Sequence, residues 1–371
     1  MTRTLLLCFG AFFAWAQPPG GAWRTDLSRR SIDLRELKPG GPPKDGIPAL
    51  NEPRFTTVRK ARSWLSPREP VIVVENGGAA RAYPLQILIW HELVNDHFGA
   101  RAILVSYCPL CNSAVVFDRS LNGQVYEFGV SGMLRESDMV MFDRQTESLW
   151  QQITGEAIVG SLAGRELTVV PGQTVSFETF QTQFPDGEVL SRNTGLDRAY
   201  GQNPYAGYES GGRLIMPINL SSTNVPRELR RSPLERILAV SIDGQTKAYP
   251  FRLLRRAGVL EDRIGNTSIV IFVDDRVTGA LDAARISEST EVGAAAVFSP
   301  ELEGRHLKFE RSKHRIVDDE THSEWNLFGV ATAGPLKGRQ LAPVSHREAF
   351  AFAWFIFRPD TVLYRDTSDC R

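Results

Sequence analysis

Two cysteines separated by two residues, Cys108-Pro109-Leu110-Cys111, are the residues of this chain best suited to chemistry. A C-x-x-C pair in a tight turn can direct two thiolates at one soft metal ion. The same pair can cycle between dithiol and disulfide, a chemistry that usually places the first cysteine at a helix N-terminus. A structural disulfide or a pair of buried thiols is the third interpretation. The motif alone leaves all three open.

A metal ion at Cys108 and Cys111 needs further ligands, because a closed zinc site has four and the chain has no second C-x-x-C. His91 is the best candidate for an additional ligand, since histidine is a common metal ligand. Asp138 and Met139, further along the chain, suggest either acid–base work by a carboxylate or ligation by a thioether. We therefore expect a copper or zinc ion as cofactor, held by Cys108, Cys111 and His91.

A second group of candidate binding residues lies between the two halves of the chain. Residues 198–222 are rich in Gly, Asn and Tyr and contain Asn203, Tyr205 and Tyr208. Such a stretch is long for a plain connection, and tyrosine and asparagine on glycine-rich loops can stack on and hydrogen-bond to a ligand. The alternative function is thus a non-catalytic module that binds a small molecule or sugar in this loop and an interdomain cleft. A hydrolase using Asp138 or Glu147 is a third possibility, without any paired carboxylate geometry to support it.

The elements around the cysteines favour strands over helices. Residues 102–107 form an apolar run that leads directly into Cys108, and residues 113–118 continue as a second strand. The pair is therefore expected in a turn between strands, which favours a metal site over a helix-activated thiol. Residues 85–98 are predicted as an amphipathic helix that carries His91 and ends at Gly99.

Two parts of the chain resemble each other. Residues 71–114 align without a gap on residues 237–280, so that Ala82-Tyr83-Pro84 matches Ala248-Tyr249-Pro250. Further on, Asp143-x-x-Thr-x-Ser-x-Trp150 matches Asp318-x-x-Thr-x-Ser-x-Trp325, which favours a turn-capping role for Asp143. In the first alignment Cys108 and Cys111 meet Asp274 and Val277. Positions present in one copy only are the candidates for chemistry.

These patterns predict an α+β fold made of two tandem copies of a mostly antiparallel, β-rich domain with few helices. We expect the first repeat domain at residues 51–197, a connecting loop at residues 198–234, and a second repeat domain without the cysteine pair at residues 235–371. Residues 17–50, rich in Pro, Gly and Arg, are expected to form a poorly ordered lead-in.

The N-terminus indicates export from the cytoplasm. Arg3 precedes an apolar run and the pattern Ala14-Trp15-Ala16, which is typical of a secretory signal peptide cleaved after Ala16. The remaining chain has no apolar stretch long enough for a membrane span, so we expect an extracytoplasmic protein, periplasmic or secreted, without an integral membrane segment. Lys plus Arg and Asp plus Glu both number 43, so net charge gives no support for binding nucleic acid. The partner is expected to be a small molecule or a metal ion.

Longer motifs connect the chain with a known family. Residues 107–113 (YCPLCNS), 128–132 (FGVSG) and 141–152 (MFDRQTESLWQQ), together with residues 203–205, resemble the domain of unknown function 3179 family. The resemblance covers most of the chain after the signal peptide. It implies an exported bacterial or archaeal protein, and it implies no activity, substrate or catalytic residue.

Overall fold

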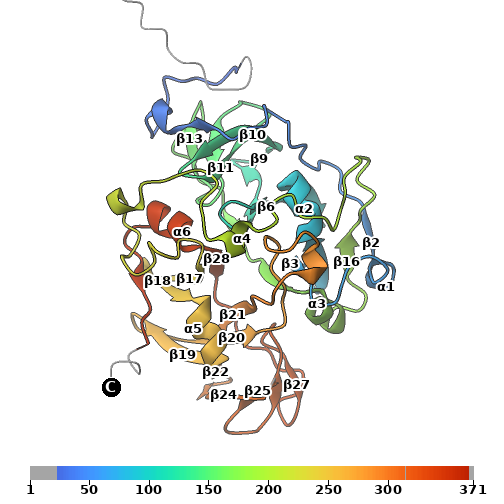
Figure 1. Ribbon diagram of the computed structural model, residues 1–371. Coiled ribbons are helices and arrows are strands. Elements are labelled where there is room, and N and C mark those ends of the chain that lie inside the picture. Colours follow the sequence, from blue (N-terminus) through green and yellow to red (C-terminus); the bar gives the residue numbers. More distant parts are fainter. Residues whose placement is uncertain (1–22, 314, 367–371) are drawn as a thin grey trace, which may run out of the picture.

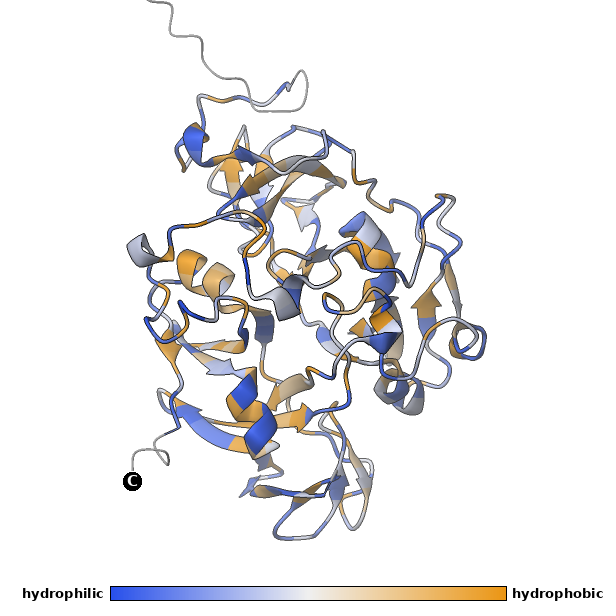
Figure 2. Cartoon of the chain, in the orientation of Figure 1, coloured by the Kyte–Doolittle hydropathy of each residue, from blue (hydrophilic) through white to orange (hydrophobic). Residues whose placement is uncertain are grey.

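The computed structural model describes residues 23–313 and 315–366, and it is built mainly of antiparallel strands (Figure 1). Its helices are short, and the most apolar of them, α6 (Ala351–Phe357), is almost entirely buried (Figure 2). The predicted β-rich α+β class with few helices is therefore confirmed. The predicted signal peptide, residues 1–16, lies outside the described residues. Within the described ranges, no helix combines the length and the apolar character that a membrane span requires.

The first half of the chain contains three sheets and a small hairpin. One sheet has the order β14-β7-β6-β5, a second β15-β3-β4-β16-β2, and a third β1-β10-β11-β12-β13. Their strands are β1 (Lys38–Pro39), β2 (Phe55–Thr57), β3 (Pro70–Asn76), β4 (Ala79–Pro84), β5 (Leu93–Phe98), β6 (Arg101–Cys108), β7 (Ser113–Asp118), β10 (Phe128–Arg135), β11 (Asp138–Asp143), β12 (Leu149–Gln151), β13 (Ala157–Val159), β14 (Val169–Val170), β15 (Gln173–Ser176) and β16 (Glu188–Leu190), and the hairpin is β8 (Ser120–Leu121) with β9 (Gln124–Val125).

The second half repeats this plan with shorter or fewer strands. Its sheets have the orders β28-β17-β18-β29, β19-β20-β21 and β24-β25-β26-β27, beside the hairpin β22-β23. The strands are β17 (Arg236–Ile242), β18 (Gln245–Pro250), β19 (Val259–Ile264), β20 (Thr267–Asp274), β21 (Ala294–Phe298), β22 (Glu301–Leu302), β23 (Arg305–His306), β24 (Phe309–Ser312), β25 (Arg315–Asp318), β26 (Glu324–Trp325), β27 (Ala331–Ala333), β28 (His346–Phe350) and β29 (Val362–Leu363).

The helices are also distributed over both halves. They are α1 (Val58–Ala61), α2 (Leu85–His91), α3 (Phe177–Gln183), α4 (Tyr208–Gly211), α5 (Phe251–Ala257) and α6, with 3₁₀ turns η1 (Leu34–Glu36), η2 (Leu220–Ser222) and η3 (Ile286–Glu288).

Corresponding elements of the two halves pair in the same register. β3 pairs with β4 so that Val71 faces Pro84, and β17 pairs with β18 so that Ile237 faces Pro250. A helix of seven residues follows in each half, α2 and α5. The halves therefore share element order and pairing, and their origin as tandem copies stays a prediction.

The two halves pack against each other through common apolar clusters. The largest cluster joins Leu104 and Val116 of the first half to Phe350 and Trp354 of the second. Residues 23–50, the expected lead-in, lie against the first half: β1 pairs with β10, and the Trp23 ring contacts the Phe142 ring at 5.3 Å between centroids. The domain boundaries predicted from the sequence remain predictions.

The helix predicted over residues 85–98 is wrong in its second half. α2 ends at His91, and Leu93–Phe98 is strand β5, which pairs along its whole length with β6. The break occurs at Glu92, whose backbone has φ 59°, a left-handed value that stops a right-handed helix. A buried non-glycine residue in this conformation leaves no periodicity signal in the sequence.

The gapless alignment of residues 71–114 on 237–280 also fails at its end. β7 follows β6 after a four-residue turn, whereas β21 follows β20 after a long connection, residues 275–293. Pairing places Ser113 opposite Cys108 and Ala294 opposite Asp274, so Ser113 corresponds to Ala294. Val277 is therefore not the structural counterpart of Cys111. The second half has no such tight turn at this point.

Candidate metal centre

The turn between β6 and β7 places both cysteines at the end of one hairpin. Cys108 is the last residue of β6 and pairs with Ser113, the first residue of β7. Asn112 closes the turn with φ 46°, and its amide donates to the Pro109 carbonyl at 3.3 Å. Pro109 fixes its own φ, which suits a tight turn. The predicted placement of the pair in a turn between strands is thus confirmed.

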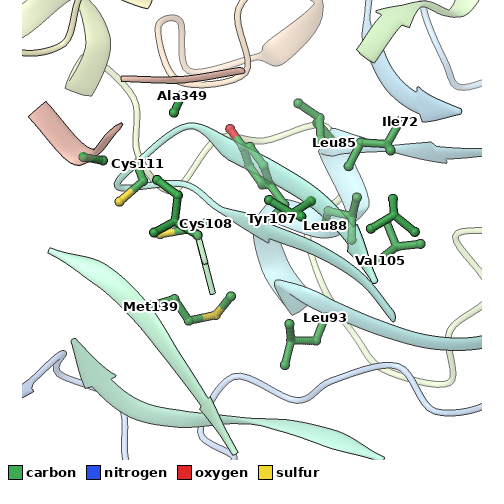
Figure 3. Close-up of a cluster of buried hydrophobic side chains, with 14 of the residues drawn as sticks. Ile72, Leu85, Leu88, Leu93, Val105, Tyr107, Cys108, Cys111, Met139 and Ala349 are labelled. Carbon is green, nitrogen blue, oxygen red and sulfur yellow. The ribbon is translucent and has the colours of Figure 1, made fainter. Parts of the chain in front are cut away.

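Asp138 reaches the cysteines from a different hairpin. β10 and β11 are joined by two residues with positive φ, Glu136 and Ser137, and Asp138 is the first residue of β11. One ligand atom each of Cys108, Cys111 and Asp138 lies within 4.8 Å of the others. Figure 3 shows both sulfur atoms on the side of the turn that faces the strand carrying Met139. Three donors therefore converge from two elements that are distant in sequence.

The Asp138 carboxylate is held at one oxygen only. Its Oδ2 accepts from Gln151 Nε2 at 2.6 Å and from the Ile153 amide at 3.0 Å. Its Oδ1 is buried and accepts no hydrogen bond from an N–H or O–H group of the described residues, and the neighbouring Cys111 and Cys108 thiols are its nearest donors. A buried carboxylate oxygen without an N–H or O–H donor is costly, and a coordinated cation is one way to satisfy it.

All three side chains are buried, and burial shifts their proton affinities. Burial raises the pKa of Cys108, and it raises the pKa of Cys111 well above its ordinary value. Burial likewise raises the pKa of Asp138 to about 6. Without a cation, both thiols are therefore protonated at neutral pH. A bound cation would stabilise the thiolates and displace their protons.

His91 lies outside this cluster. Its Nδ1 contacts the Pro48 carbonyl at 2.8 Å, and its Nε2 contacts the Tyr200 hydroxyl at 2.6 Å. Both ring nitrogens are thus engaged, and Asp138 offers the third ligand atom that we expected from His91. Ligation by His91 stays a prediction that would require one of these hydrogen bonds to break.

The loop with Asn203, Tyr205 and Tyr208 lies over the cysteine turn. The Tyr208 hydroxyl donates to the Leu110 carbonyl at 2.8 Å, inside the C-P-L-C motif. The Asn203 side chain donates to the Ala283 carbonyl at 2.9 Å and accepts from the Tyr205 amide. The structure therefore brings Tyr208 of this loop to the cysteine turn, and both Asn203 and Tyr208 are hydrogen-bonded to the protein itself.

Glu92 is a member of this region that the sequence did not reveal. It is only 6% exposed, and burial, then the charge of Asp138, raise its pKa to about 8. No hydrogen bond to its carboxylate occurs among the described residues. The corresponding residue of the second half is Gly258, which has nearly the same backbone conformation, φ 72° and ψ −40°. The alignment of Glu92 with a glycine in the second half was the sequence signal for its unusual backbone conformation.

The arrangement can hold a small cation with two sulfur ligands and one oxygen ligand. Zinc accepts cysteine and carboxylate ligands, and a site with three protein ligands keeps a fourth position for water or another group. The cysteines follow a strand and precede a strand, so neither lies at a helix N-terminus that would lower its pKa. The geometry thus suits a metal centre better than a reactive thiol.

The fold and this cluster define a β-rich protein with a buried cysteine–carboxylate site. The family model described as "Protein of unknown function (DUF3179)" matches residues 44–361, and the chain belongs to this family. No curated protein matches the chain, and no solved structure does.

Proposed function

We propose that this protein binds a zinc or copper ion through Cys108, Cys111 and Asp138 and acts outside the cytoplasm. The observation that carries the proposal is the convergence of three buried ligand atoms within 4.8 Å of one another. The buried Oδ1 of Asp138 supports it, because no N–H or O–H group of the described residues donates to that oxygen and only the two cysteine thiols lie beside it. The signal-peptide pattern at residues 1–16 supports export.

The ligand types favour zinc over copper. Cu(I) prefers thiolate and thioether ligands, whereas a carboxylate is a hard oxygen ligand that Zn(II) accepts beside thiolates. Asp138 therefore argues for Zn(II). Met139 follows Asp138 directly in β11 and is buried beside the site, where its thioether could bind Cu(I). The experiment must therefore distinguish zinc from copper.

Thiol redox chemistry is the competing use of the pair. The raised pKa values of Cys108 and Cys111 oppose it, because the thiolate is the nucleophile and burial suppresses the thiolate. Binding of a small molecule or sugar by the loop has less support, because two of its three predicted residues, Asn203 and Tyr208, already bond to backbone carbonyls. No contact of the described residues favours either alternative over the metal centre.

Elemental analysis of the purified mature protein tests the proposal. We expect about one zinc ion per chain in the wild type and almost none in Cys108→Ser or Asp138→Asn, since removing one of three ligands weakens binding strongly. His91→Gln should keep its metal, and Asp186→Asn, an exposed carboxylate in a turn far from the cluster in sequence, serves as the matched control.

The alternatives give different results in the same samples. Equal metal content in the wild type and Cys108→Ser would overturn the metal centre. A disulfide between the two cysteines, detected by thiol alkylation and mass measurement, would support redox chemistry instead. Copper in place of zinc would keep the site and correct the ion. The mass of the mature chain reports cleavage after Ala16 independently.

A further inference from the structure

The second half carries two arginines at positions where the first half has uncharged residues. Helix α3 of the first half corresponds to α6 of the second, and the residue after each helix is Phe184 and Arg358 respectively, with similar backbone angles. In the preceding strands, β15 pairs with β3 and β28 with β17 in the same register, so Gln173 corresponds to Arg347. Two arginines thus replace a glutamine and a phenylalanine.

The two halves use the first of these positions reciprocally. Gln173 of the first half donates through Nε2 to the Leu327 carbonyl of the second, at 2.7 Å. Arg347 of the second half donates through Nη1 to the Ile153 carbonyl of the first, at 2.9 Å. A glutamine is sufficient for this structural hydrogen bond. The remaining donors and the charge of Arg347 are therefore additional to what the fold needs.

The second position differs even more. Phe184 packs its ring against Phe180 and Phe328, at centroid distances of 5.7 and 5.1 Å. Arg358 instead lines a cavity of about 230 Å³, together with Arg347. The other residues of the wall are Ala239, Ser241, Ser345, His346 and Trp354. The equivalent position thus makes an apolar ring contact in the first half and lines a cavity with a positive charge in the second.

Neither arginine forms an ion pair with a carboxylate of the described residues. Some half-buried arginines of this protein form ion pairs, such as Arg236 with Glu209 and Arg81 with Asp96. Among the described residues, no carboxylate lies within 4.0 Å of the guanidinium group of Arg347 or Arg358. Burial, and then the neighbouring charge of Arg358, lower the pKa of Arg347 to about 10, and Glu166 only partly offsets this. Two like charges that line one cavity with no carboxylate in contact are costly.

We propose that the cavity between Arg347 and Arg358 binds a small oxyanion, a carboxylate or a phosphate group. The two guanidinium groups supply charge-assisted donors, which suit the paired oxygens of such groups. The Ser345 hydroxyl and the Trp354 ring give the cavity one polar and one apolar wall. The volume fits a small organic acid or inorganic phosphate and excludes a large ligand.

The anion site is linked to the metal centre through a single residue. Ile153 accepts a hydrogen bond from Arg347 at its carbonyl and donates one from its amide to Asp138 Oδ2. An anion that draws Arg347 toward the cavity would act on the strand end that holds Asp138. The anion site itself rests on the arginines alone and not on the proposed metal.

Binding of inorganic phosphate and of succinate to the full chain, measured by isothermal titration calorimetry at low ionic strength, tests the proposal. We expect saturable binding of one of the two probes, which identifies the class of oxyanion. Arg347→Gln and Arg358→Phe introduce the residues of the first half and should each weaken binding at least about tenfold, the effect of one charge-assisted hydrogen bond. Arg339→Gln, an exposed arginine paired with Glu303, is the matched control and should bind like the wild type.

Each outcome either supports or overturns the anion site. Absence of saturable binding of both probes overturns the anion site, as does binding that Arg347→Gln and Arg358→Phe leave unchanged. Both variants introduce residues that the first half carries at the equivalent positions, so we expect them to fold. Thermal unfolding checks this. If both unfold, competition between the probe and chloride on the wild type decides: binding that resists about 0.1 M chloride supports a specific site, and binding lost in chloride does not. Cys108→Ser should retain anion binding, so failure of the metal proposal is recognised separately.

Discussion

The two halves of this protein share a framework, and one turn separates them clearly. In the first half, β6 and β7 are joined by the four residues that include Cys111; in the second, β20 and β21 are joined by residues 275–293. This long connection does not merely lack the cysteines. Asn203 and Gly207 bond to its Ala284 and Asp282 carbonyls, while Tyr208 on the same loop bonds to Leu110. The second half therefore helps to cover the site that only the first half contains.

The shared residues show what the fold itself requires. Asp143 accepts from the Thr146 amide at 2.7 Å and from Trp150 Nε1 at 3.0 Å. Asp318 accepts from Thr321 and from Trp325 Nε1 in the same manner. The predicted turn-capping role of Asp143 is confirmed. A residue with equal contacts in both halves is structural, which leaves the unequal residues as candidates for function.

The largest expected difference between the halves is the effect of metal on stability. Zinc that binds only the folded state stabilises it by about 4 kcal/mol at a free concentration near 1,000 times Kd. We expect this stabilisation in the wild type and its loss in Cys108→Ser, measured by urea denaturation with and without zinc. Asp274→Ser, the change at the equivalent position of the second half, should keep the zinc response. A zinc response that survives in Cys108→Ser would place the metal elsewhere.

The shared aspartates should matter equally. Asp143→Ala and Asp318→Ala each leave a buried indole N–H and at least one turn amide without an acceptor, at an expected loss of about 3 kcal/mol in the free energy of unfolding. Chemical denaturation of both variants measures the loss. A much smaller loss in the second half would show that the common motif is not equally important for stability in both halves. It would then be wrong to infer that residues with equal contacts in both halves are structural.

Local patterns in the sequence predicted the strands that carry the cysteines, but not what reaches them. Residues 102–107 and 113–118 are apolar runs on either side of a tight turn. Strands and turns of this kind depend mainly on residues that are close in sequence, so the sequence pattern predicts them. Asp138 arrives from another hairpin, and only the tertiary packing of β11 against the β6–β7 turn brings it within range. For this reason the sequence suggests acid–base work for Asp138 and does not identify it as a ligand. Likewise, the helix ends at Glu92 because its backbone takes a positive φ, which the apolar pattern of residues 85–98 does not reveal.

Glu92 offers a sharper comparison, because its counterpart is Gly258. A non-glycine residue at φ 59° carries about 1 kcal/mol of strain, and the ionised carboxylate is costly to bury. Glu92→Gly should therefore raise stability by about 2 kcal/mol at pH 9, measured by chemical denaturation. Glu92→Ala, which keeps the strain, should gain less. In the second half, Gly258→Ala should destabilise the protein, since the new Cβ would lie 2.1 Å from Arg311 Cδ.

The pH dependence of Glu92 follows from its raised pKa. The folded state holds the proton up to about pH 8, whereas the unfolded state loses it near 4.5. The unfolded state therefore binds fewer protons between these values, and stability falls as the pH rises through this window. Glu92→Gln should make the metal-free protein less sensitive to pH between 4.5 and 8. An unchanged slope would show that Glu92 titrates normally.

The smallest expected effect concerns the loop that covers the site. Tyr208→Phe removes one hydroxyl, and with it the hydrogen bond to the Leu110 carbonyl, while the ring keeps its contact with Phe350 at 6.0 Å. A single neutral hydrogen bond contributes about 1 kcal/mol, so stability should fall by that amount. If the bond also fixes the cysteine turn for the metal, zinc affinity should fall severalfold, measured by competition with a chelator. Tyr364→Phe in the second half removes a hydroxyl far from the turn in sequence, and it should leave zinc affinity unchanged. Equal zinc affinity in the wild type and Tyr208→Phe would mean that the hairpin holds the cysteine turn by itself, and that the loop only covers it.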